Sequence, residues 1–579
     1  MTAEPMWFDS GGRPMFGWWH VPDGHRARGG VVLCLPLAME GTAARPTFRL
    51  LASRLEAAGF VVLRFDYDGT GDSAGSPDDP GRVPAWIDSV RSAIRVVRSS
   101  RVPRVTVVGM RMGATLAAAT IGSEDSAALP DGLVLWDPCT SGRSFLRQQR
   151  LMRATIEVAH TEEEGVVEGP GIVFGPEAAA AMSALSVDGI ETTLARKVLV
   201  LTRAGHRRDH ALVTRLSMPH VEWAEVAGQE DLVDVEPHFA KVPEAALRTI
   251  VSWLSALGAD GLRPVTPSSV SPGEAAVVGR DADGCPIRER SLRLGPNGLF
   301  GIVTEGERRN GGPTFVFLPA GVIDHTGPAR LWVEIGRRWA ALGFETLRFD
   351  TGGLGDSDPR GSQSRWFGSA PESIDDVRDT MNAVGHGDPT SLVLVGLCSG
   401  GYLINEVVLG GMKPRGAYMI NPVFRPRDDV LQNPDASAGR LVPPSRHRWA
   451  KALPAHNLLS PIVENLPSPA WWALNRVAIR NAEAMTLQRV SERITDMLII
   501  SNAPEARLHT RGGHLAFRRL SRRGRFRLEV FDEIDHTLLA RVPRDRAFDL
   551  ITQHVWTRYG STNDDTSANT DHCLQSVRP

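Results

Sequence analysis

The chain has 579 residues, of which 42% are hydrophobic and 23% are charged, and its formal net charge is −2. That length exceeds what one hydrophobic core supports, so two domains are expected. The nearly balanced charge excludes a global field that would attract nucleic acid or a membrane surface, and no run reaches the roughly 18 apolar residues of a membrane span.

Cysteine usage and the first residues indicate the compartment. The five cysteines are few, odd in number and without the spacing of metal ligands, which favours a reducing interior. The N-terminal segment has no basic patch followed by an apolar run, so no secretory signal is expected. We therefore expect a cytoplasmic protein with no metal and no other cofactor.

Strand and helix patterns alternate along the first half. A hairpin pattern near residue 12 is followed by GGVVLCLPL, FRLLASRLEAAG, VVLRFD, PAWIDSVRSAIRVV and VPRVTVVGM. Short apolar runs that end at Pro or Gly suit buried strands, and apolar residues three and four apart suit helices. The alternation predicts a mostly parallel sheet with helices on both faces.

The same order of patterns returns in the second half, with a hairpin near residue 297 and then TFVFLPAG, RLWVEIGRRWAALG, ETLRFD, SIDDVRDTMNAV and SLVLVGL. AAGFVVLRFDYDGTGDS at 57–73 matches ALGFETLRFDTGGLGDS at 341–357, 284 residues later (341 − 57). The repeat predicts two tandem domains of one fold. The expected units are a first domain at 1–258, a Pro- and Ser-rich connector at 259–285, a second domain at 286–558 and a disordered polar tail at 559–579.

Each half also carries a long insertion before its last strands, at 140–195 and at 424–494. Structureless loops of this length are uncommon in compact domains, so we expect helical caps. The second insertion contains Trp471 and Trp472, which would either line a site for an apolar acyl group or dock the cap on its domain.

The two halves differ at one motif. GMRMG at 109–113 answers GLCSG at 396–400, and only the second carries a nucleophile, Cys398. Flanking glycines allow a sharp strand-to-helix turn that exposes the middle side chain at the carboxyl edge of the sheet. The helix N-terminus would favour the thiolate. The N–H of Ser399 and the turn at Gly321 would form an oxyanion hole.

A general base and an acid are needed beside the nucleophile. His536 follows the last apolar strand of the second half, where the first half has Asp231. Because the first half also has Arg111 at the elbow, we expect it to be a pseudo-hydrolase. The acid of the second half is Glu505. A shift of one residue would put Pro504 there and leave a Cys–His dyad.

These motifs resemble the α/β-hydrolase superfamily over all of the chain except the connector and tail. The first half, with FDYDGTGDS, GMRMG and LWDPCTSGRSFLRQQR, is similar to serine-aminopeptidase-like hydrolases found beside exosortase systems. The second half, with AGVIDHTGPARLW, FDTGGLGDS, GLCSGG and DHT, resembles a related group in which cysteine replaces the elbow serine, as it does in dienelactone hydrolases. The resemblance implies an α/β fold of two tandem α/β-hydrolase domains, each a doubly wound sheet with a helical cap.

Five further residues are candidates for a role. Asp66, Asp72, Asp350 and Asp356 recur in both halves, including the half without a nucleophile, which favours a structural role in the loop after the strand. His325, near the expected oxyanion hole, would either contact substrate or lie at the surface.

Arginines are concentrated between the acid and the base. The run comprises Arg507, Arg511, Arg518, Arg519, Arg522, Arg523, Arg525 and Arg527. It is either a solvated face or a dock for an acidic partner, such as an acyl carrier protein or the phosphates of coenzyme A.

The expected function is therefore that of a hydrolase or acyltransferase. It would act on a small-molecule ester or thioester, either free or bound to a carrier protein or to CoA, through an acyl-Cys398 intermediate, with His536 as the base. No nucleic acid or membrane partner is expected. The competing hypothesis is a non-catalytic binding protein built from two decayed domains, and a third is that the first half scaffolds or regulates the second. Fast thiol alkylation would favour a catalytic Cys398.

Overall fold

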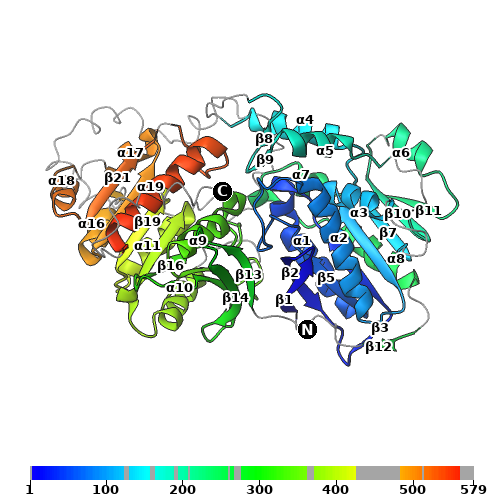
Figure 1. Ribbon diagram of the computed structural model, residues 1–579, viewed down its shortest axis with the longest axis horizontal. Helices are drawn as coiled ribbons and strands as arrows, with labels where there is room; N and C mark the ends of the chain where they lie inside the picture. The colour runs from blue at the N-terminus through cyan, green and yellow to red at the C-terminus, as the bar shows by residue number, and fades with distance from the viewer. Residues whose placement is uncertain are drawn as a thin grey trace, which may run out of the picture.

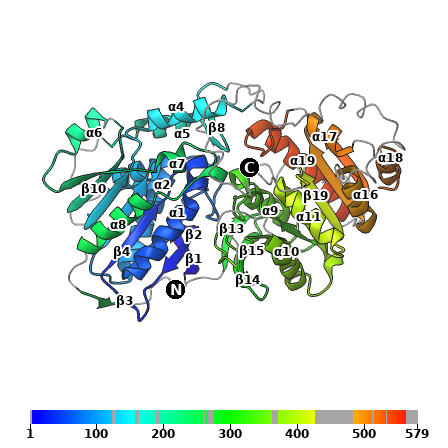
Figure 2. The ribbon, with the colours of Figure 1, turned by 180° about the vertical axis from the view of Figure 1, so that it is seen from behind.

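The computed structural model describes residues 3–122, 129–156, 163–187, 194–206, 209–257, 261–265, 275–360, 371–424, 483–510, 514–531 and 533–560. Two sheets lie side by side, one in each half of the chain (Figure 1, and from behind Figure 2). Each sheet has helices on both of its faces.

The first sheet has eight strands in the order β1-β2-β5-β4-β6-β7-β10-β11. They are β1 (Glu4–Ser10), β2 (Arg13–His20), β4 (Gly29–Cys34), β5 (Phe60–Phe65), β6 (Val105–Met110), β7 (Gly132–Trp136), β10 (Lys197–Arg203) and β11 (Val221–Val226). The pairs from β5 to β11 are parallel, and β2 runs antiparallel to both of its neighbours.

Helices cover both faces of this sheet. The helices are α1 (Ala38–Ala57), α2 (Arg82–Ser99), α3 (Met112–Gly122), α6 (His210–Arg215) and α8 (Glu244–Leu257). Apolar residues of α2 and α3 pack in one buried cluster, and those of α1 and α8 in another on the opposite face. The near-continuous burial of the central strands agrees with the apolar runs that mark strands covered on both sides.

The second sheet repeats this order and adds one edge strand. Its nine strands run β13-β14-β15-β17-β16-β18-β19-β20-β21. They are β13 (Ala275–Arg280), β14 (Pro286–Leu294), β15 (Leu299–Gly306), β16 (Thr314–Phe317), β17 (Thr346–Phe349), β18 (Leu392–Leu397), β19 (Gly416–Ile420), β20 (Asp496–Ser501) and β21 (Phe526–Val530). The predicted architecture, two tandem α/β domains that each contain a mostly parallel sheet with helices on both faces, is confirmed.

Helices also cover both faces of the second sheet. The helices are α9 (Leu331–Ala341), α10 (Pro371–Val384), α11 (Ser399–Leu409), α16 (Glu483–Arg493), α17 (Ala503–Thr510), α18 (His514–Arg522) and α19 (Arg541–Tyr559). α10, α11, α16 and α18 share one buried cluster, whereas α9 and α19 share the other.

The connector expected at 259–285 is shorter than predicted. β13, which lies inside that range, is the edge strand of the second sheet, so the second sheet begins before residue 286. Nearer its start, β12 (Arg263–Pro264) pairs with β3 (Arg26–Ala27) of the first half. The tail beyond residue 560 lies outside the described residues.

The first insertion forms a cap of helices and one hairpin. It contains α4 (Gly142–Arg153), α5 (Pro176–Ala184) and the antiparallel hairpin of β8 (Val167–Gly169) and β9 (Ile172–Phe174). In the second insertion, residues 425–482, and with them Trp471 and Trp472, lie outside the described residues. The hairpin was not expected from sequence, and it lies at the boundary between the two halves in both ribbon views.

The two halves share a buried apolar cluster. Trp18 of β2 packs edge-on against Phe300 of β15, with 4.8 Å between ring centroids. Val278 of β13 and Ile287 of β14 belong to the same cluster. Burial of large aromatic side chains contributes strongly to stability. This cluster should therefore stabilise the contact between the halves in the way that a hydrophobic core stabilises a domain.

Candidate active site

Cys398 lies at a sharp turn between β18 and α11. Its backbone has φ 55° and ψ −117°, a conformation that costs energy for a residue with a side chain. The turn is held by two hydrogen bonds, because the Cys398 N–H donates to the Ile420 carbonyl at 3.0 Å and the Val423 N–H donates to the Cys398 carbonyl at 3.0 Å. A Cβ at Gly396 would approach the backbone of Gly400 to 2.6 Å, so the flanking glycine is required.

The predicted base and acid meet beside this turn. His536 lies in the loop after β21, and its Nδ1 is 3.1 Å from Glu505 Oε1. Cys398 is close enough to the same imidazole to help raise its pKa. The structure thus brings together Cys398, His536 and Glu505, the residues predicted as nucleophile, base and orienting acid.

Glu505, and not Pro504, faces His536 because of how α17 begins. The Asn502 side chain accepts a hydrogen bond from the Glu505 N–H at 2.9 Å, which caps the first turn of the helix. Within the described residues, Glu505 Oε2 is buried without a hydrogen-bond partner. The Glu505 carboxylate therefore contacts His536 through its other oxygen, Oε1.

Asn421 is a site residue that sequence reasoning missed. It follows β19 with φ 41°, and its side-chain amide donates to the carbonyls of Asp535 and His536 at 3.1 and 3.0 Å. Its Oδ1 accepts from the Asn502 N–H at 3.3 Å. One side chain thus connects the loop of the base to the segment of the acid. A polar residue directly after a buried strand, matched by Asp137 in the first half, was the available signal.

The charges of the site favour an imidazolium. Desolvation opposes protonation of His536, but its interactions with Cys398 and Glu505 outweigh burial and raise its pKa to about 10. Burial acts against the charge of Glu505 as well, yet the hydrogen bond with His536 lowers the pKa of that carboxyl.

Ser399 and Gly321, the residues predicted to form an oxyanion hole, lie next to each other beside Cys398. Ser399 is the first residue of α11, so its N–H has no acceptor within the helix. The Gly321 N–H, however, is not free, because it donates to Ser399 Oγ at 2.6 Å. A substrate oxygen must therefore displace this hydroxyl from Gly321, or accept a hydrogen bond from it.

The elbow of the first half has the same backbone and different chemistry. Arg111 has φ 52°, and its N–H donates to the Trp136 carbonyl at 3.0 Å, as Cys398 does to Ile420. Its guanidinium lies 3.1 Å from Glu40 Oε1 and 3.4 Å from Asp137 Oδ2. An ion-pair cluster thus fills the place where a nucleophile would meet substrate.

Two other groups of the first half do not replace the missing nucleophile and base. Burial raises the pKa of nearby Cys139 to about 12, so this side chain stays a neutral thiol. Asp231 lies in the short helix α7 (Glu230–Val233), in the segment after β11. Neither side chain provides a thiolate or an imidazole beside Arg111.

The expectation that His325 contacts substrate or lies at the surface is wrong. The side chain is buried between the halves, with Nδ1 2.8 Å from Asp350 Oδ2 and Nε2 2.7 Å from Asp72 Oδ2. Burial works against its charge, but the two carboxylates raise the pKa of His325 well above the usual value. The four repeated aspartates, including Asp66 and Asp356, are all buried.

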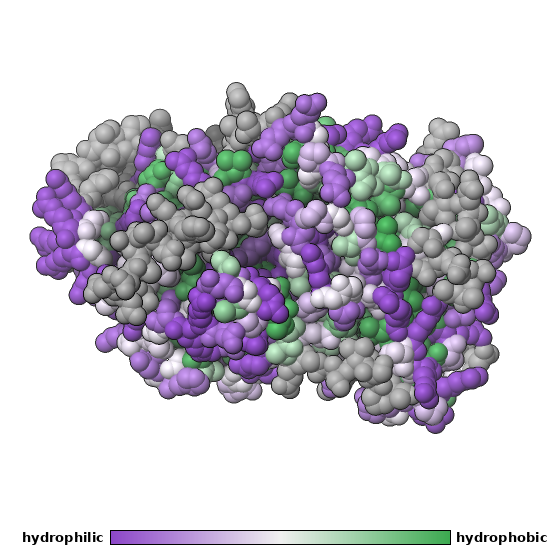
Figure 3. Space-filling model, in the orientation of Figure 1, coloured by the Kyte–Doolittle hydropathy of each residue, from purple (hydrophilic) through white to green (hydrophobic). Residues whose placement is uncertain are grey.

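Most of the arginine run lies on the surface of the second half. The exposed members in the described residues are Arg507, Arg518, Arg519, Arg522, Arg523, Arg525 and Arg527. Several belong to α18 or to the turn before β21, and hydrophilic side chains gather at that end of the molecule (Figure 3). Arg511 lies outside the described residues.

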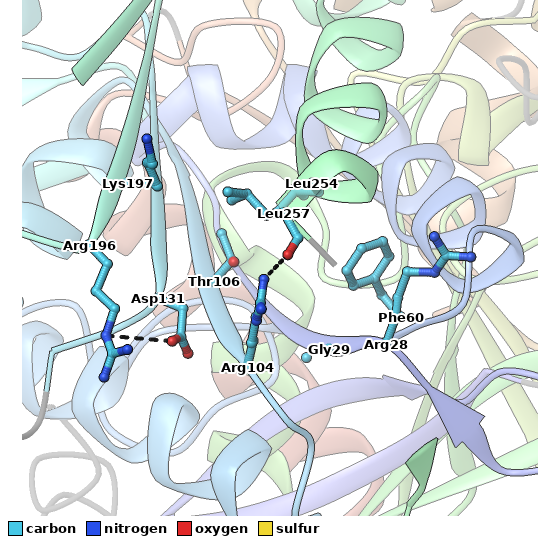
Figure 4. A pocket seen from close by; sticks show the side chains of 11 residues that line it. Arg28, Gly29, Phe60, Arg104, Thr106, Asp131, Arg196, Lys197, Leu254 and Leu257 are labelled. Atoms are coloured by element: carbon cyan, nitrogen blue, oxygen red, sulfur yellow. Dashed lines mark hydrogen bonds and ion pairs between the residues drawn. The ribbon is translucent and has the colours of Figure 1, made fainter. Parts of the chain in front are cut away.

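A separate cavity of about 280 Å³ lies in the first half (Figure 4). It opens where the parallel strands begin, near Phe60, Arg104 and Lys197, with Leu257 at the end of α8. Ligands of such sheets bind at the opposite, carboxyl edge. None of the three residues of the Cys398 site lines this cavity.

Two further features concern metals and membranes. Within the part of the chain that the structure describes, no group of three His, Cys, Asp or Glu side chains is placed to hold a metal ion. Among the described helices, none combines the length and apolar character that crossing a bilayer requires.

No family model and no curated protein matches the chain. Among solved structures, Est1E from Butyrivibrio proteoclasticus with bound ferulic acid is similar at 12% identity over 43% of this chain and 96% of that one, with a TM-score of 0.34. Similar too is a CIB-like hydrolase from Thermoplasma acidophilum, at 17% identity over 44% of this chain and 99% of that one, with a TM-score of 0.29. Proline iminopeptidase from Mycobacterium smegmatis is similar at 15% identity over 44% of this chain and 99% of that one, with a TM-score of 0.29. These likenesses fall on the N-terminal half.

The fold and the site together define a class. The protein has two tandem α/β domains, each a mostly parallel sheet with helices on both faces, with an arginine at the strand-to-helix turn of the first and a cysteine at that of the second.

Proposed function

We propose that the second half transfers an acyl group from a carboxylic ester or thioester through Cys398. The observation that carries this proposal is the strained Cys398 turn beside His536, which is itself paired with Glu505 at 3.1 Å. A strained elbow persists only where the surrounding structure holds it, and such strain is concentrated at functional sites.

In the first step the Cys398 thiolate attacks the carbonyl carbon. The resulting oxyanion accepts hydrogen bonds from the Ser399 N–H and from Gly321 or the Ser399 hydroxyl. The intermediate collapses with cleavage of the bond to the leaving oxygen or sulfur, which takes a proton from the His536 imidazolium. The product is acyl-Cys398 and a free alcohol or thiol.

In the second step neutral His536 removes a proton from water, or from an alcohol or amine acceptor, as that group attacks the acyl carbon. Collapse of this intermediate releases the carboxylic acid or the transferred product and restores the thiolate–imidazolium pair. Glu505 keeps the imidazole ring oriented throughout. No metal or cofactor is needed for either step.

The first half, in this proposal, has no hydrolase chemistry. The guanidinium of Arg111 is not a nucleophile, and its pairing with Glu40 leaves it satisfied. The pseudo-hydrolase assignment rests on this substitution together with Asp231 in place of a histidine.

We further propose that an acidic carrier presents the acyl group, in a reducing, cytoplasmic setting. The exposed arginines at α18 supply the complementary charge. Arg522→Glu/Arg523→Glu should raise KM for a thioester on an acyl carrier protein and leave KM for a small free thioester unchanged. Arg308→Glu/Arg309→Glu is the matched control, because these neighbouring arginines are 63% and 60% exposed elsewhere on the same half. Equal KM values in both double variants would contradict the carrier dock.

The deciding experiment looks for the intermediate. The protein is incubated with short- and medium-chain acyl thioesters, quenched, and searched by mass spectrometry for an acyl group on the Cys398 peptide. We expect an adduct that is absent in Cys398→Ala and retained in Cys285→Ala, because Cys285 is the other described cysteine that is not buried. A folded protein with neither adduct nor turnover would favour a non-catalytic binding protein.

A further inference from the structure

We propose that the first half is a positioning domain, which holds in place the two loops that carry the catalytic groups of the second half. The loops are the oxyanion loop, residues 320–330, and the base loop, residues 533–540. The inference rests on the proposed function, since it assigns the degenerate half a role in that same site. Its direct support is a set of contacts that cross between the halves.

The middle of the oxyanion loop is tied to the first half through His325. The His325 N–H and Nδ1 both contact Asp350 of its own half, while Nε2 lies 2.7 Å from Asp72 of the other half. The neighbouring Asp324 pairs with Arg45 of the first half at 3.3 Å. Gly321, whose N–H was predicted as an oxyanion donor, is only four residues from His325.

The end of the oxyanion loop is held more tightly still. Arg330 donates to the carbonyls of Gly71, Ser73 and Gly75 in the first half at 2.8, 2.6 and 2.9 Å. The backbone here is strained, because Ala329 and Arg330 both have positive φ, 49° and 66°. Such conformations persist only where surrounding contacts impose them. For this loop, part of those contacts comes from the other half.

The base loop is held by the β8–β9 hairpin of the first half. The Gly171 N–H donates to the Leu539 carbonyl at 3.0 Å, and Glu168 Oε1 accepts from the Arg541 N–H at 2.9 Å. Leu538, two residues after His536, has φ 56° and is buried. The hairpin therefore fixes the chain immediately after the base.

One glycine shows that the hairpin touches both loops. A Cβ at Gly171 would come within 2.7 Å of the Ala329 Cβ and 3.4 Å of a Leu539 methyl. The tip of the hairpin thus lies between the oxyanion loop and the base loop. Displacing either loop by 1 Å would lower a rate substantially, since catalysis depends on reacting groups held at contact distance.

The test separates positioning from general stabilisation. In the full chain, Glu168→Ala removes the acceptor of the Arg541 N–H and the partner of buried Arg153, whereas Glu168→Gln keeps an oxygen for both. We expect Glu168→Ala to lower kcat for thioester cleavage by about 10-fold or more, with KM changed less than about twofold. Deuterium uptake at 533–540 should rise. Glu168→Gln should restore most of the rate.

Two further variants complete the test. Arg330→Ala should act in the same way on the oxyanion loop, with faster exchange at 320–330. Arg54→Ala is the control, because its pair with Glu244 is exposed and lies within the first half. Wild-type kcat and exchange in both Glu168→Ala and Arg330→Ala would overturn the proposal. If the wild-type protein forms no acyl-Cys398, the proposed function fails, and the exchange measurement alone decides whether the first half holds the loops.

Discussion

Phe16 and Phe300 contact each other across the interface of the two halves, with ring centroids 6.1 Å apart. The two residues are 284 positions apart (300 − 16), the same separation as the repeated loops. The Phe16 N–H donates to Ser73 Oγ at 2.9 Å, and the Phe300 N–H donates to Ser357 Oγ at 2.8 Å. A residue that contacts its own counterpart marks an isologous interface, as in a two-fold symmetric dimer.

The buried ion pairs follow the same symmetry. Arg64 of the first half pairs with Asp356 of the second, and Arg348 of the second pairs with Asp72 of the first at 3.0 Å. Each arginine is also 284 positions from its counterpart (348 − 64). The halves therefore pack as two subunits of a symmetric dimer would, within one chain.

Removing one member of the Arg64–Asp356 pair should destabilise the protein, because the remaining charge stays buried without it. Asp356→Ala leaves a buried guanidinium with one partner fewer, so we expect a loss of about 3–5 kcal/mol in unfolding free energy. Arg64→Met together with Asp356→Leu should cost less than either single change. A double-mutant cycle measured by denaturant unfolding tests this prediction. Additive losses would show that the two charges do not interact.

The exposed pair Arg54–Glu244 is the matched comparison. The Arg54 and Glu244 side chains are 33% and 48% exposed. Its coupling in the same kind of cycle should be about 0.2–1 kcal/mol. A coupling as large as that of the buried pair would contradict the argument from burial.

Alkylation of Cys398 should depend on His536. The pKa of His536 is raised to about 10, so its imidazolium persists near neutral pH, and a neighbouring cation makes a cysteine more reactive. Iodoacetamide should therefore modify Cys398 faster in the wild type than in His536→Gln at pH 7. Equal rates in the two proteins would contradict the pairing. Peptide mapping over time gives both rates, with buried Cys34 and Cys139 as unreactive internal controls.

Stability should fall at alkaline pH through His325. Its folded pKa is raised above the unfolded value of about 6.5, so its contribution is fully present below that pH and is lost as pH rises through the folded pKa. Both ring nitrogens face carboxylates, of Asp72 and Asp350, and a neutral ring donates to only one. Asp72 also pairs with Arg348, which does not titrate in this range.

His325→Gln removes that titration. The variant should unfold at lower denaturant than the wild type at pH 6, and the difference should shrink as the pH is raised toward 10. Denaturant midpoints at several pH values measure it. A difference that is constant with pH would mean that His325 is not charged in the folded protein.

Glu505→Gln should impair catalysis without abolishing it. The amide keeps one hydrogen bond to His536 but removes the negative charge that helps raise the histidine pKa. A thiolate needs less assistance than an alkoxide, so we expect a loss of about 10- to 100-fold in kcat, smaller than the roughly 10⁴-fold loss for the same change in a serine triad. Steady-state kinetics on a thioester would show it. Unchanged kcat would indicate a working Cys–His dyad.

The sequence allowed the fold to be predicted because its signals are local. A few consecutive residues are enough to indicate a buried strand, an amphipathic helix or the GLCSG turn. The order of strand and helix patterns also occurs twice, once in each half. The proximity of Cys398, His536 and Glu505 could be anticipated because the carboxyl ends of neighbouring parallel strands meet at one edge. The structure places all three there.

The rest could not be predicted, because it depends on contacts between residues far apart in the chain. His325 and Asp72 are 253 positions apart, and nothing in their local patterns indicates that they meet. The Gly321 N–H donates to the Ser399 hydroxyl, and the Asn421 side-chain amide donates to the base loop. Both hydrogen bonds join segments that are far apart in the sequence. The connector was drawn too long because β13, an edge strand with exposed positions, lacks a strong apolar pattern.

The symmetry of the interface has a consequence for how this protein can change over evolutionary time. In a dimer of identical chains, every substitution appears in both subunits, so an arginine at the elbow would abolish both sites at once. Joined in one chain, the copies are free to differ, and one elbow holds Arg111 while the other holds Cys398. The surfaces that face each other keep their matched residues, such as Phe16 with Phe300. Because both copies lie in one chain, the interface can stay symmetric while the two strand-to-helix turns differ.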